Sequence, residues 1–419
     1  MKPADLVRAA IAAISRGDHD WVADARALKP RLDTAAPRID ADSALPPDIL
    51  DALFESRMFR MLLPRAFGGD ELDFVTFFDV VGIIAEGDAS AAWSVAQSNG
   101  CAMAAAYLDP RVAEAIFGHA RAVLSWGYPT GPCRAQAVDG GWTVNGTWGF
   151  GSGNRHSTWL GGHCQVFDEK GEPQRSRQGA PRERTMLFER TAVTILAEQW
   201  NVIGLRGTGS DTYMVKDMFV PADHALVSRA VGRDLQQPEH AEIEEEPERR
   251  EAGTLYRFSP TAVYQAGFSA VALGIARATL DAFIALAQQK IPSGGGTLLR
   301  DNAVIQARVA HSEARRASSR AWIRQILADM WQECAETGRH GYAHRIQMRL
   351  AAPYCVEEAR QVVEDSYADA GATAIFAANP FERRLRDIHA VAQQVQANPV
   401  HFQTVGQFYL GLKPHNRFI

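Results

Sequence analysis

The order in which helical and strand-like periodicities follow one another constrains the fold of this chain more than any single motif. Apolar residues recur at helical spacing up to about residue 118, and short β-type runs separated by turn residues then occupy residues 121–227. From residue 254 onward, long helical stretches return. Because a uniform bundle or a single sheet would keep one period, this order predicts a helical region, a β region and a second helical region.

These regions predict a mainly α protein with a central β domain. We expect an N-terminal helical domain at residues 1–120 and a compact β-barrel or sandwich at residues 121–228. Residues 229–253 are polar and rich in glutamate, which indicates a solvated acidic linker. Residues 254–419 contain about four helical stretches, which indicates a C-terminal four-helix bundle.

Charge and composition exclude several classes of function. The net charge of −5 leaves no basic surplus for nucleic acid, so we expect no nucleic-acid partner. We find no uninterrupted apolar run long enough to span a bilayer and no signal-peptide pattern at the start, so we expect a cytoplasmic protein without a membrane partner. The five cysteines are far apart and the twelve histidines form no tight metal-ligand spacing, so we expect reduced buried thiols and no metal site.

The segment Gly-Leu-Arg-Gly-Thr-Gly-Ser-Asp-Thr at residues 204–212 is the densest local signal in the β region. Three glycines, several hydroxyls and one arginine allow the backbone to lie close to a flat ligand. The glycine spacing matches neither a dinucleotide fingerprint nor a P-loop. A plain turn between two strands is the alternative interpretation of the segment.

Five segments, in order, resemble the acyl-CoA dehydrogenase superfamily over nearly the whole chain. They are the Leu-Pro and Phe-Gly-Gly turn at 63–69, the helix start at 85–90, the tryptophan- and glycine-rich strand pair at 141–153, the end of the β region at 200–221, and Asn-Pro-Phe-Glu-Arg-Arg-Leu-Arg-Asp at 379–387. The resemblance implies a homotetramer, and a flavin held between the β domain and the last bundle. The flavin contacts that it implies come from Trp148, Phe150, Ser152, Gly153, Arg206, Gly207 and Thr208.

The superfamily contains dehydrogenases and oxygenases, and the C-terminal residues distinguish the two. A dehydrogenase needs a carboxylate base over the flavin ring to remove a weakly acidic proton. Aligning the Arg-Asp pair of this chain with that of the family places Val395 where the glutamate stands in many members, and no Asp or Glu occurs at residues 388–419. Glu251 and Asp281 are conceivable substitutes, since some members carry the base on an earlier helix.

The other branch of the superfamily comprises two-component flavin monooxygenases, and this chain resembles their oxygenase components. Such a component takes reduced FMN or FAD from a separate NAD(P)H:flavin reductase and reacts it with O2. The flavin C4a-hydroperoxide that forms then hydroxylates an aromatic or heteroaromatic molecule, and an indole-like substrate is our hypothesis for this chain. The resemblance implies catalytic roles for Ser125, Ser152, His389 and Gln394, and a substrate pocket formed by Asn99, Ser125 and Trp126.

Two departures from this branch concern the predicted substrate site. Some members place histidines where this chain has Gln393-Gln394 and Ser98-Asn99, which disfavours a phenol substrate because a phenol benefits from a nearby base. Structural alternatives also stay open, with Ser152 as a turn residue, Trp148 as part of a core and His389 as a surface histidine paired with an acid. Two further functions stay open: an acyl-CoA dehydrogenase with a relocated base, and a non-catalytic flavin-binding descendant of the fold.

Overall fold

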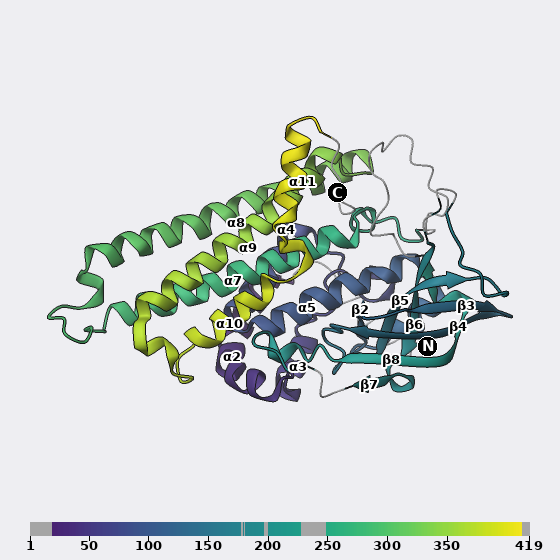
Figure 1. Ribbon diagram of the computed structural model, residues 1–419, viewed down its shortest axis with the longest axis horizontal. Coiled ribbons are helices and arrows are strands. Elements are labelled where there is room, and N and C mark those ends of the chain that lie inside the picture. Colours follow the sequence, from purple (N-terminus) through teal and green to yellow (C-terminus); the bar gives the residue numbers. More distant parts are fainter. Residues whose placement is uncertain (1–18, 177–178, 180, 197–199, 228–248, 413–419) are drawn as a thin grey trace.

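The computed structural model describes residues 19–176, 179, 181–196, 200–227 and 249–412. Figure 1 shows helices first, then a sheet, and then a long helical bundle that extends away from the sheet. The predicted order of helical, β and helical regions therefore matches the structure. Most of the predicted acidic linker at residues 229–253 lies outside the described residues, which resume at residue 249.

Short polar side chains fix the starts of the N-terminal helices. Asp73 accepts hydrogen bonds from the backbone N–H groups of Val75 and Thr76, and Asp88 accepts one from Ala91 at the start of the next helix. The helices of this region are α2 (Trp21–Asp42), α3 (Pro47–Glu55), α4 (Phe74–Gly87), α5 (Ala89–Ala102) and α6 (Pro110–Phe117), with 3₁₀ turns η1 (Arg65–Phe67) and η2 (Met103–Tyr107). α5 contains many small residues and is buried along most of its length, as its composition predicts.

The described strands form one mixed sheet in the order β7-β8-β4-β3-β5-β6-β9, with β1 paired to β5 and β2 to β4. The strands are β1 (Leu124–Trp126), β2 (Tyr128–Pro129), β3 (Arg134–Val138), β4 (Gly141–Gly149), β5 (Trp159–Phe167), β6 (Glu183–Glu189), β7 (Thr194–Leu196), β8 (Thr212–Pro221) and β9 (Ala225–Val227). β4 connects β8 to the rest of the sheet, because it pairs antiparallel with both β3 and β8. Val144 and Trp148 of β4 are buried in the core, and the register of its pairing with β8 shifts between Val144 and Gly146.

The C-terminal bundle consists of three long helices and a shorter fourth. They are α7 (Pro260–Ala287), α8 (Ala303–Thr337), α9 (Tyr342–Ala370) and α10 (Phe381–Val391), followed by α11 (Val400–Tyr409). Contrary to the expectation from sequence, α7 is long and apolar enough by length and composition to pass a test for a membrane span. Its most apolar window is 67% buried inside the protein, because α7 is the central helix of the bundle and packs against α4, α5 and α9.

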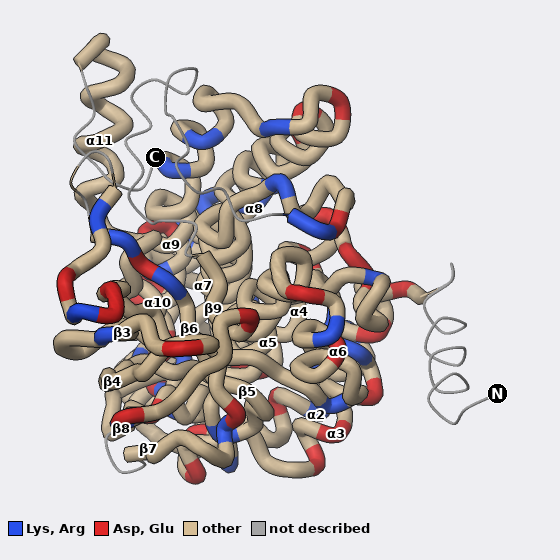
Figure 2. Tube along the Cα trace, turned by 90° about the vertical axis from the view of Figure 1, so that its right-hand side faces the viewer, with Lys and Arg blue, Asp and Glu red and all other residues tan. Residues whose placement is uncertain are grey.

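Charged side chains of both signs are interleaved along the outer helices, as Figure 2 shows for one face. On α7 and α8 they form an ion-pair network in which Arg277 contacts Asp281 and Glu313, and Glu313 also contacts Arg316. All five cysteines are buried and free. Burial raises the pKa of Cys101 to about 12, so this cysteine is a neutral thiol.

The glycine segment at residues 204–212 lies between helices of both helical regions, and this packing explains two of its glycines. A Cβ on Gly204 would lie 2.1 Å from the backbone oxygen of Arg386 in α10. A Cβ on Gly207 would lie 2.1 Å from Cγ2 of Ile39 in α2 and 2.9 Å from Cβ of Ser90 in α5. The absence of a side chain therefore lets the β region dock against α2, α5 and α10.

We predict that Gly204→Ala destabilises the protein by about 1–3 kcal/mol, since the new methyl group overlaps a backbone atom that cannot move alone. Gly131→Ala is the matched control, because a Cβ there meets no atom within 4 Å. Thermal unfolding of both variants checks the prediction. Equal melting temperatures for the two variants would contradict the proposed docking role.

Candidate functional site

Ser152 lies in a tight turn that follows β4, where the β region meets α5. Phe150 and Gly153 both have positive φ, at 57° and 82°, so the chain reverses sharply on either side of the serine. The N–H of Gly153 donates to the carbonyl of Thr208, which ties this turn to the glycine segment. Ser152 is only 6% exposed, so its hydroxyl lies in a protected environment.

A chain of hydrogen bonds runs through Ser152. The indole Nε1 of Trp93 donates to its Oγ over 3.1 Å, and this Oγ lies 2.7 Å from Oγ of Ser210. The Oγ of Ser210 lies 2.7 Å from Oγ1 of Thr208, which in turn donates to the carbonyl of Leu205 over 2.8 Å. Predicted flavin contacts Ser152 and Thr208 are therefore brought together, with Ser210 between them.

An aromatic layer from α5 and α7 lies beside this chain. The ring of Trp93 stacks on Phe268 with centroids 3.8 Å apart and planes 4° apart, and Tyr264 stacks on the same phenylalanine at 5.5 Å. The hydroxyl of Tyr264 accepts from Nε1 of Trp126 over 3.1 Å. We call Trp93, Phe268, Tyr264 and Trp126 the aromatic layer. Its planar faces suit a flat ring system.

Sequence reasoning predicted only Trp126 of the aromatic layer. Two signals were available for the others. Tyr264 and Phe268 are four residues apart and therefore share one face of α7. Trp93 is a single large ring in a helix of small residues. Neither signal indicates which segments meet, because α5 and α7 are far apart in the sequence.

Ser125 belongs to a second buried polar group. Ser157 Oγ lies 2.6 Å from Oγ of Ser125 and 2.8 Å from the carbonyl of Gly153, and a Cβ on Gly153 would lie 3.2 Å from Oγ of Ser125. The same Cβ would lie 3.1 Å from Nε2 of His156, a buried atom with no hydrogen-bond partner. Burial lowers the pKa of His156 to about 4, so its imidazole is neutral near pH 7.

Two predicted site residues have structural contacts instead. Trp148 is fully buried in the core of the β region, where it stacks on Tyr213 and donates to the carbonyl of His163. Asn99 is also fully buried, and its amide binds the backbone of Leu62, Met58 and Val95. Both side chains are thus engaged in packing and in backbone hydrogen bonds, and their assignment to the flavin site and the substrate pocket stays a prediction.

His389 and Gln394 lie away from the hydroxyl chain in all the contacts that the structure describes. Nε2 of His389 lies 3.4 Å from a carboxylate oxygen of Glu364, and the side-chain oxygen of Gln394 accepts from the N–H of Gln396 at the start of a 3₁₀ turn. For His389 this contact is the open structural alternative, a surface histidine paired with an acid, whereas the cap made by Gln394 was not expected from the sequence. Neither contact brings the residue to Ser152.

Three further residues of the predicted flavin site have separate contacts in the structure: Phe150, Arg206 and Gly207. Gly207 packs against α2 and α5, and its predicted contact with a flavin stays a prediction. The carbonyl of Arg206 accepts from Nε1 of Trp200, so this residue is part of a turn whose side chain is half-buried. Phe150 is 66% exposed and its ring contacts Trp200 edge-on at 6.1 Å. Ile203 is also 66% exposed.

Two observations support the fit of a flavin at Phe150 and Ser152. The exposed ring of Phe150 forms apolar surface two residues from the buried hydroxyl of Ser152, and a flat heteroaromatic ring covers such surface favourably. Ser152 Oγ accepts one hydrogen bond from Trp93 and has a second lone pair for a ligand. Residues Phe150, Ser152 and Thr208 are therefore the ones that would hold the group.

No carboxylate belongs to the hydroxyl chain or the aromatic layer in the part of the chain that the structure describes. Asp281, one conceivable substitute base, is ion-paired with Arg277 on the outer side of α7. Glu251, the other, is close to Glu71, and partial burial together with this negative neighbour raises its pKa. Neither acid contacts a residue of the hydroxyl chain in the contacts that the structure describes.

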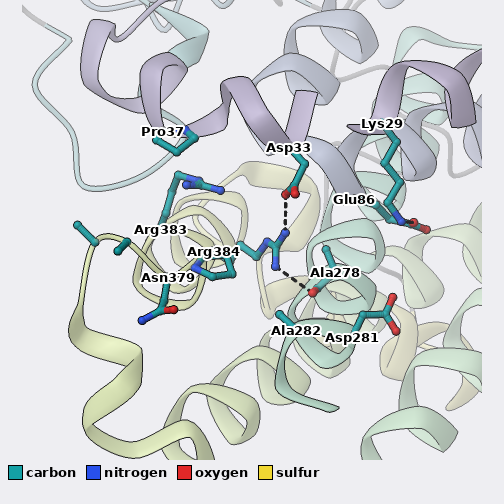
Figure 3. A pocket seen from close by; sticks show the side chains of 13 residues that line it. Lys29, Asp33, Pro37, Glu86, Ala278, Asp281, Ala282, Asn379, Arg383 and Arg384 are labelled. Carbon is teal, nitrogen blue, oxygen red and sulfur yellow. Dashed lines mark hydrogen bonds and ion pairs between the residues drawn. The ribbon is translucent and has the colours of Figure 1, made fainter. Parts of the chain in front are cut away.

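A cavity of about 360 Å³ lies elsewhere, between α2, α7 and the start of α10 (Figure 3). In this cavity Arg384 donates to Asp33 and to the carbonyl of Ala278, and Lys29 pairs with Glu86. Its charged groups are therefore mostly paired with one another. None of the hydroxyl-chain residues lines it.

Two buried acids hold the glycine segment in place from the helical side. Asp387 of α10 accepts from the N–H of Leu205 over 2.7 Å, and burial raises its pKa to about 7. Burial also raises the pKa of Asp88, the cap of α5, to about 6. The guanidinium of Arg383 attracts both carboxylates and opposes these shifts. The position of the hydroxyl chain thus depends on a buried charge cluster.

Comparisons with known proteins identify similar chains. Residues 266–399 match the family model "Acyl-CoA dehydrogenase, C-terminal domain". The chain is 26% identical to an indole-3-acetate monooxygenase of Acinetobacter baumannii, with 93% of this chain and 94% of the relative covered. It is 28% identical to the oxygenase subunit HsaA of a flavin-dependent monooxygenase from Rhodococcus jostii, with 87% of this chain and 91% of the relative covered.

A solved structure supports the fold. XiaF from a Streptomyces species, determined in complex with FADH2 and glycerol, superposes with a TM-score of 0.83 at 19% identity and covers 98% of both chains. At this identity the likeness shows the fold alone. Together with the family match, it establishes the acyl-CoA dehydrogenase-like architecture predicted from the five segments.

We predict that Asp387→Asn weakens the pH dependence of stability, because it removes a buried charge and keeps an oxygen for the N–H of Leu205. A carboxyl whose pKa is raised in the folded state contributes stability that is present below its ordinary pKa near 3.8 and lost as pH rises through about 7. The variant should therefore lose less stability than the unmodified protein between pH 5 and pH 8. Melting temperatures at both pH values measure this difference.

Asp387→Ala is the contrasting variant, since it leaves the buried N–H of Leu205 unpaired. It should lower stability by about 1–3 kcal/mol at both pH values. Asp301→Asn on the exposed surface is the matched control. If the pH dependence of Asp387→Asn equals that of the control, the carboxyl does not titrate in the way we describe.

Proposed function

We propose that this protein, a member of the acyl-CoA dehydrogenase superfamily whose relatives are flavin-dependent oxygenases, is the oxygenase component of a two-component flavin monooxygenase. The observation that carries the proposal is the pairing of a buried hydroxyl chain with an aromatic layer, neither of which includes a carboxylate among the described residues; the nearby carboxyl of Asp387 is committed to the N–H of Leu205. Proton abstraction next to a thioester needs a base there, whereas oxygen transfer needs a dry pocket and a hydrogen-bonding hydroxyl.

Reduced FMN or FAD supplies the electrons and activates O2 when it is bound, and the protein supplies binding, orientation and exclusion of water. Ser152 is the residue that hydrogen-bonds the flavin, and Phe150 covers the flavin ring with apolar surface. Arg206 is the candidate contact for the flavin phosphate, since a guanidinium presents a fork of donors. The NAD(P)H chemistry belongs to a separate flavin reductase, which agrees with the subunit name of the Rhodococcus jostii relative.

The substrate in this proposal is a small aromatic or heteroaromatic molecule of the indole type. The aromatic layer offers stacking surfaces of Trp93, Phe268 and Tyr264, and Gln97 of α5 adds a polar group near Tyr264. The neutral, buried His156 stands near Ser125 and provides no charged base for a phenol. An electron-rich ring that reacts without prior ionisation therefore suits this site best. One named relative, the indole-3-acetate monooxygenase, acts on such a compound.

The proposed assembly is a homotetramer. Apolar side chains remain exposed at two separate places on the bundle, on Ile375 and Phe376 after α9 and on Val400, Tyr409 and Leu410 at α11. Exposed apolar groups favour burial against a second protein surface. A second copy of the chain is the partner that the family resemblance implies.

We predict that the protein, mixed anaerobically with photoreduced FMN or FAD and an indole and then with aerated buffer, delays the return of oxidised-flavin absorbance and hydroxylates the indole. With ¹⁸O2 the product should contain one labelled oxygen atom. Stopped-flow absorbance and mass spectrometry measure the two effects. Ser152→Ala should shorten the delay about fivefold, the factor that one neutral hydrogen bond contributes.

Ser318→Ala, an exposed serine on α8, is the matched control and should leave the delay unchanged. Bleaching of the oxidised flavin complex by an acyl-CoA would instead indicate a dehydrogenase. Immediate flavin oxidation without product, with every aromatic compound tried, would point to a flavin-binding protein without this activity.

A further inference from the structure

The hydrogen-bond chain through Ser152 has ends of opposite and fixed character. At one end, the indole N–H of Trp93 is a donor only, so Ser152 must accept from it. At the other end, the carbonyl of Leu205 is an acceptor only, and Oγ1 of Thr208 donates to it over 2.8 Å. Each of the three hydroxyls between these ends has a single proton to donate. The direction of every bond follows from this count.

The hydroxyl of Thr208 uses its proton in the hydrogen bond to the carbonyl of Leu205. Thr208 must therefore accept a hydrogen bond from Ser210, since the two oxygens lie 2.7 Å apart. The Ser210 proton is then used, so Ser210 must accept from Ser152, also at 2.7 Å. All four bonds of the chain are formed in this direction. Ser152 then directs its own proton inward, and its remaining lone pair is free.

If the hydroxyl protons of the chain point the other way, the chain has one hydrogen bond fewer. If Thr208 turned its proton to Ser210, and Ser210 turned its proton to Ser152, the hydroxyl bond to Leu205 would be lost. The carbonyl of Leu205 would keep the backbone N–H of Thr208 at 3.2 Å. The Ser152 proton would have no acceptor within the chain and would need one on a ligand. Because all three hydroxyls are at least 94% buried, water cannot readily replace the missing partner.

We infer that this chain presets Ser152 as a hydrogen-bond acceptor, and that the site thereby selects reduced flavin over oxidised flavin. The inference rests on the proposed function, in which Ser152 hydrogen-bonds the flavin, and it takes N5 as the ring atom that the hydroxyl meets. In reduced flavin N5 carries a hydrogen and donates, which matches the free lone pair. In oxidised flavin N5 is an acceptor, so Ser152 must turn its proton away from Ser210, which leaves the chain with one bond fewer.

Thr208, Ser210 and Trp93 are positioning residues in this scheme, because they set the proton on Ser152. Thr208 anchors the direction through Leu205. Trp93 prevents Ser152 from donating toward α5, and its stack on Phe268 holds the indole in place. An oxygenase supplied by a reductase benefits from this selection, since the site then binds reduced flavin more tightly than oxidised flavin.

The test is the ratio of dissociation constants for oxidised and reduced flavin, measured anaerobically with FMN and with FAD by equilibrium ultrafiltration. The unmodified protein should bind the reduced form at least ~5-fold more tightly, the factor that one neutral hydrogen bond contributes. Thr208→Val removes the anchoring hydroxyl, so Ser210 is free to donate to Ser152. We expect this ratio to fall by ~5-fold or more. Thr208→Ser restores the hydroxyl and should keep the ratio of the unmodified protein.

A second variant guards against a local packing defect in Thr208→Val. Ser210→Ala removes the inward acceptor of the Ser152 proton, and it should lower the ratio in the same direction. If both variants fold, as judged by their melting temperatures, and keep the original ratio, the inference is overturned while the proposed function stands. If the unmodified protein binds neither reduced FMN nor reduced FAD, the inference and the proposed function both fail.

Discussion

The docking of the glycine segment between the two helical regions is the contact on which the rest of the structure depends. Gly204 and Gly207 bring the backbone against α10 and α2 at distances that no side chain would allow. The N–H of Leu205 then reaches the buried carboxyl of Asp387. Without this docking the β region would have no fixed position relative to α5 and α7. Ser152 and Thr208 would then lose the geometry that joins them to Trp93.

This arrangement connects stability with function through a short piece of chain. The carbonyl of Leu205 terminates the hydroxyl chain, and the N–H of the same residue binds Asp387. One peptide segment is therefore held by the helical bundle and at the same time sets the protons at the candidate flavin site. The buried acids raise the free energy of the folded state at neutral pH, since burial disfavours their charged forms. Such a destabilising cluster is understandable where it fixes a functional segment.

The sequence predicts the fold well because periodicity and caps act locally. Helical patterns in the sequence at residues 74–84, 89–107, 260–290, 301–336 and 340–370 indicate helices there, and α4, α5, α7, α8 and α9 occupy these ranges. Strand β5 was missed, since Trp159–Phe167 contains two glycines and does not alternate cleanly. Helix α2 was missed as well, and it contains Pro30 and Pro37. The resemblance named Ser152 and Thr208, which lie in one hydrogen-bonded cluster. Spacing cannot show the direction of a side chain, so it gave no sign that Trp148 packs in the core of the β region or that Asn99 binds backbone groups.

The glycine segment shows most clearly what sequence alone leaves undecided. A run of glycines indicates that something approaches the backbone closely, and a flat ligand and a packed helix satisfy that requirement equally. Only the three-dimensional arrangement shows that helices occupy the space beside Gly204 and Gly207. The hydroxyls of the same segment then carry the chemistry, because Thr208 and Ser210 are buried and bonded toward Ser152. Within nine residues the glycines fix the fold and the hydroxyls define the site, while the nearby carboxyls of Asp387 and Asp211 are held by the N–H of Leu205 and by Arg155.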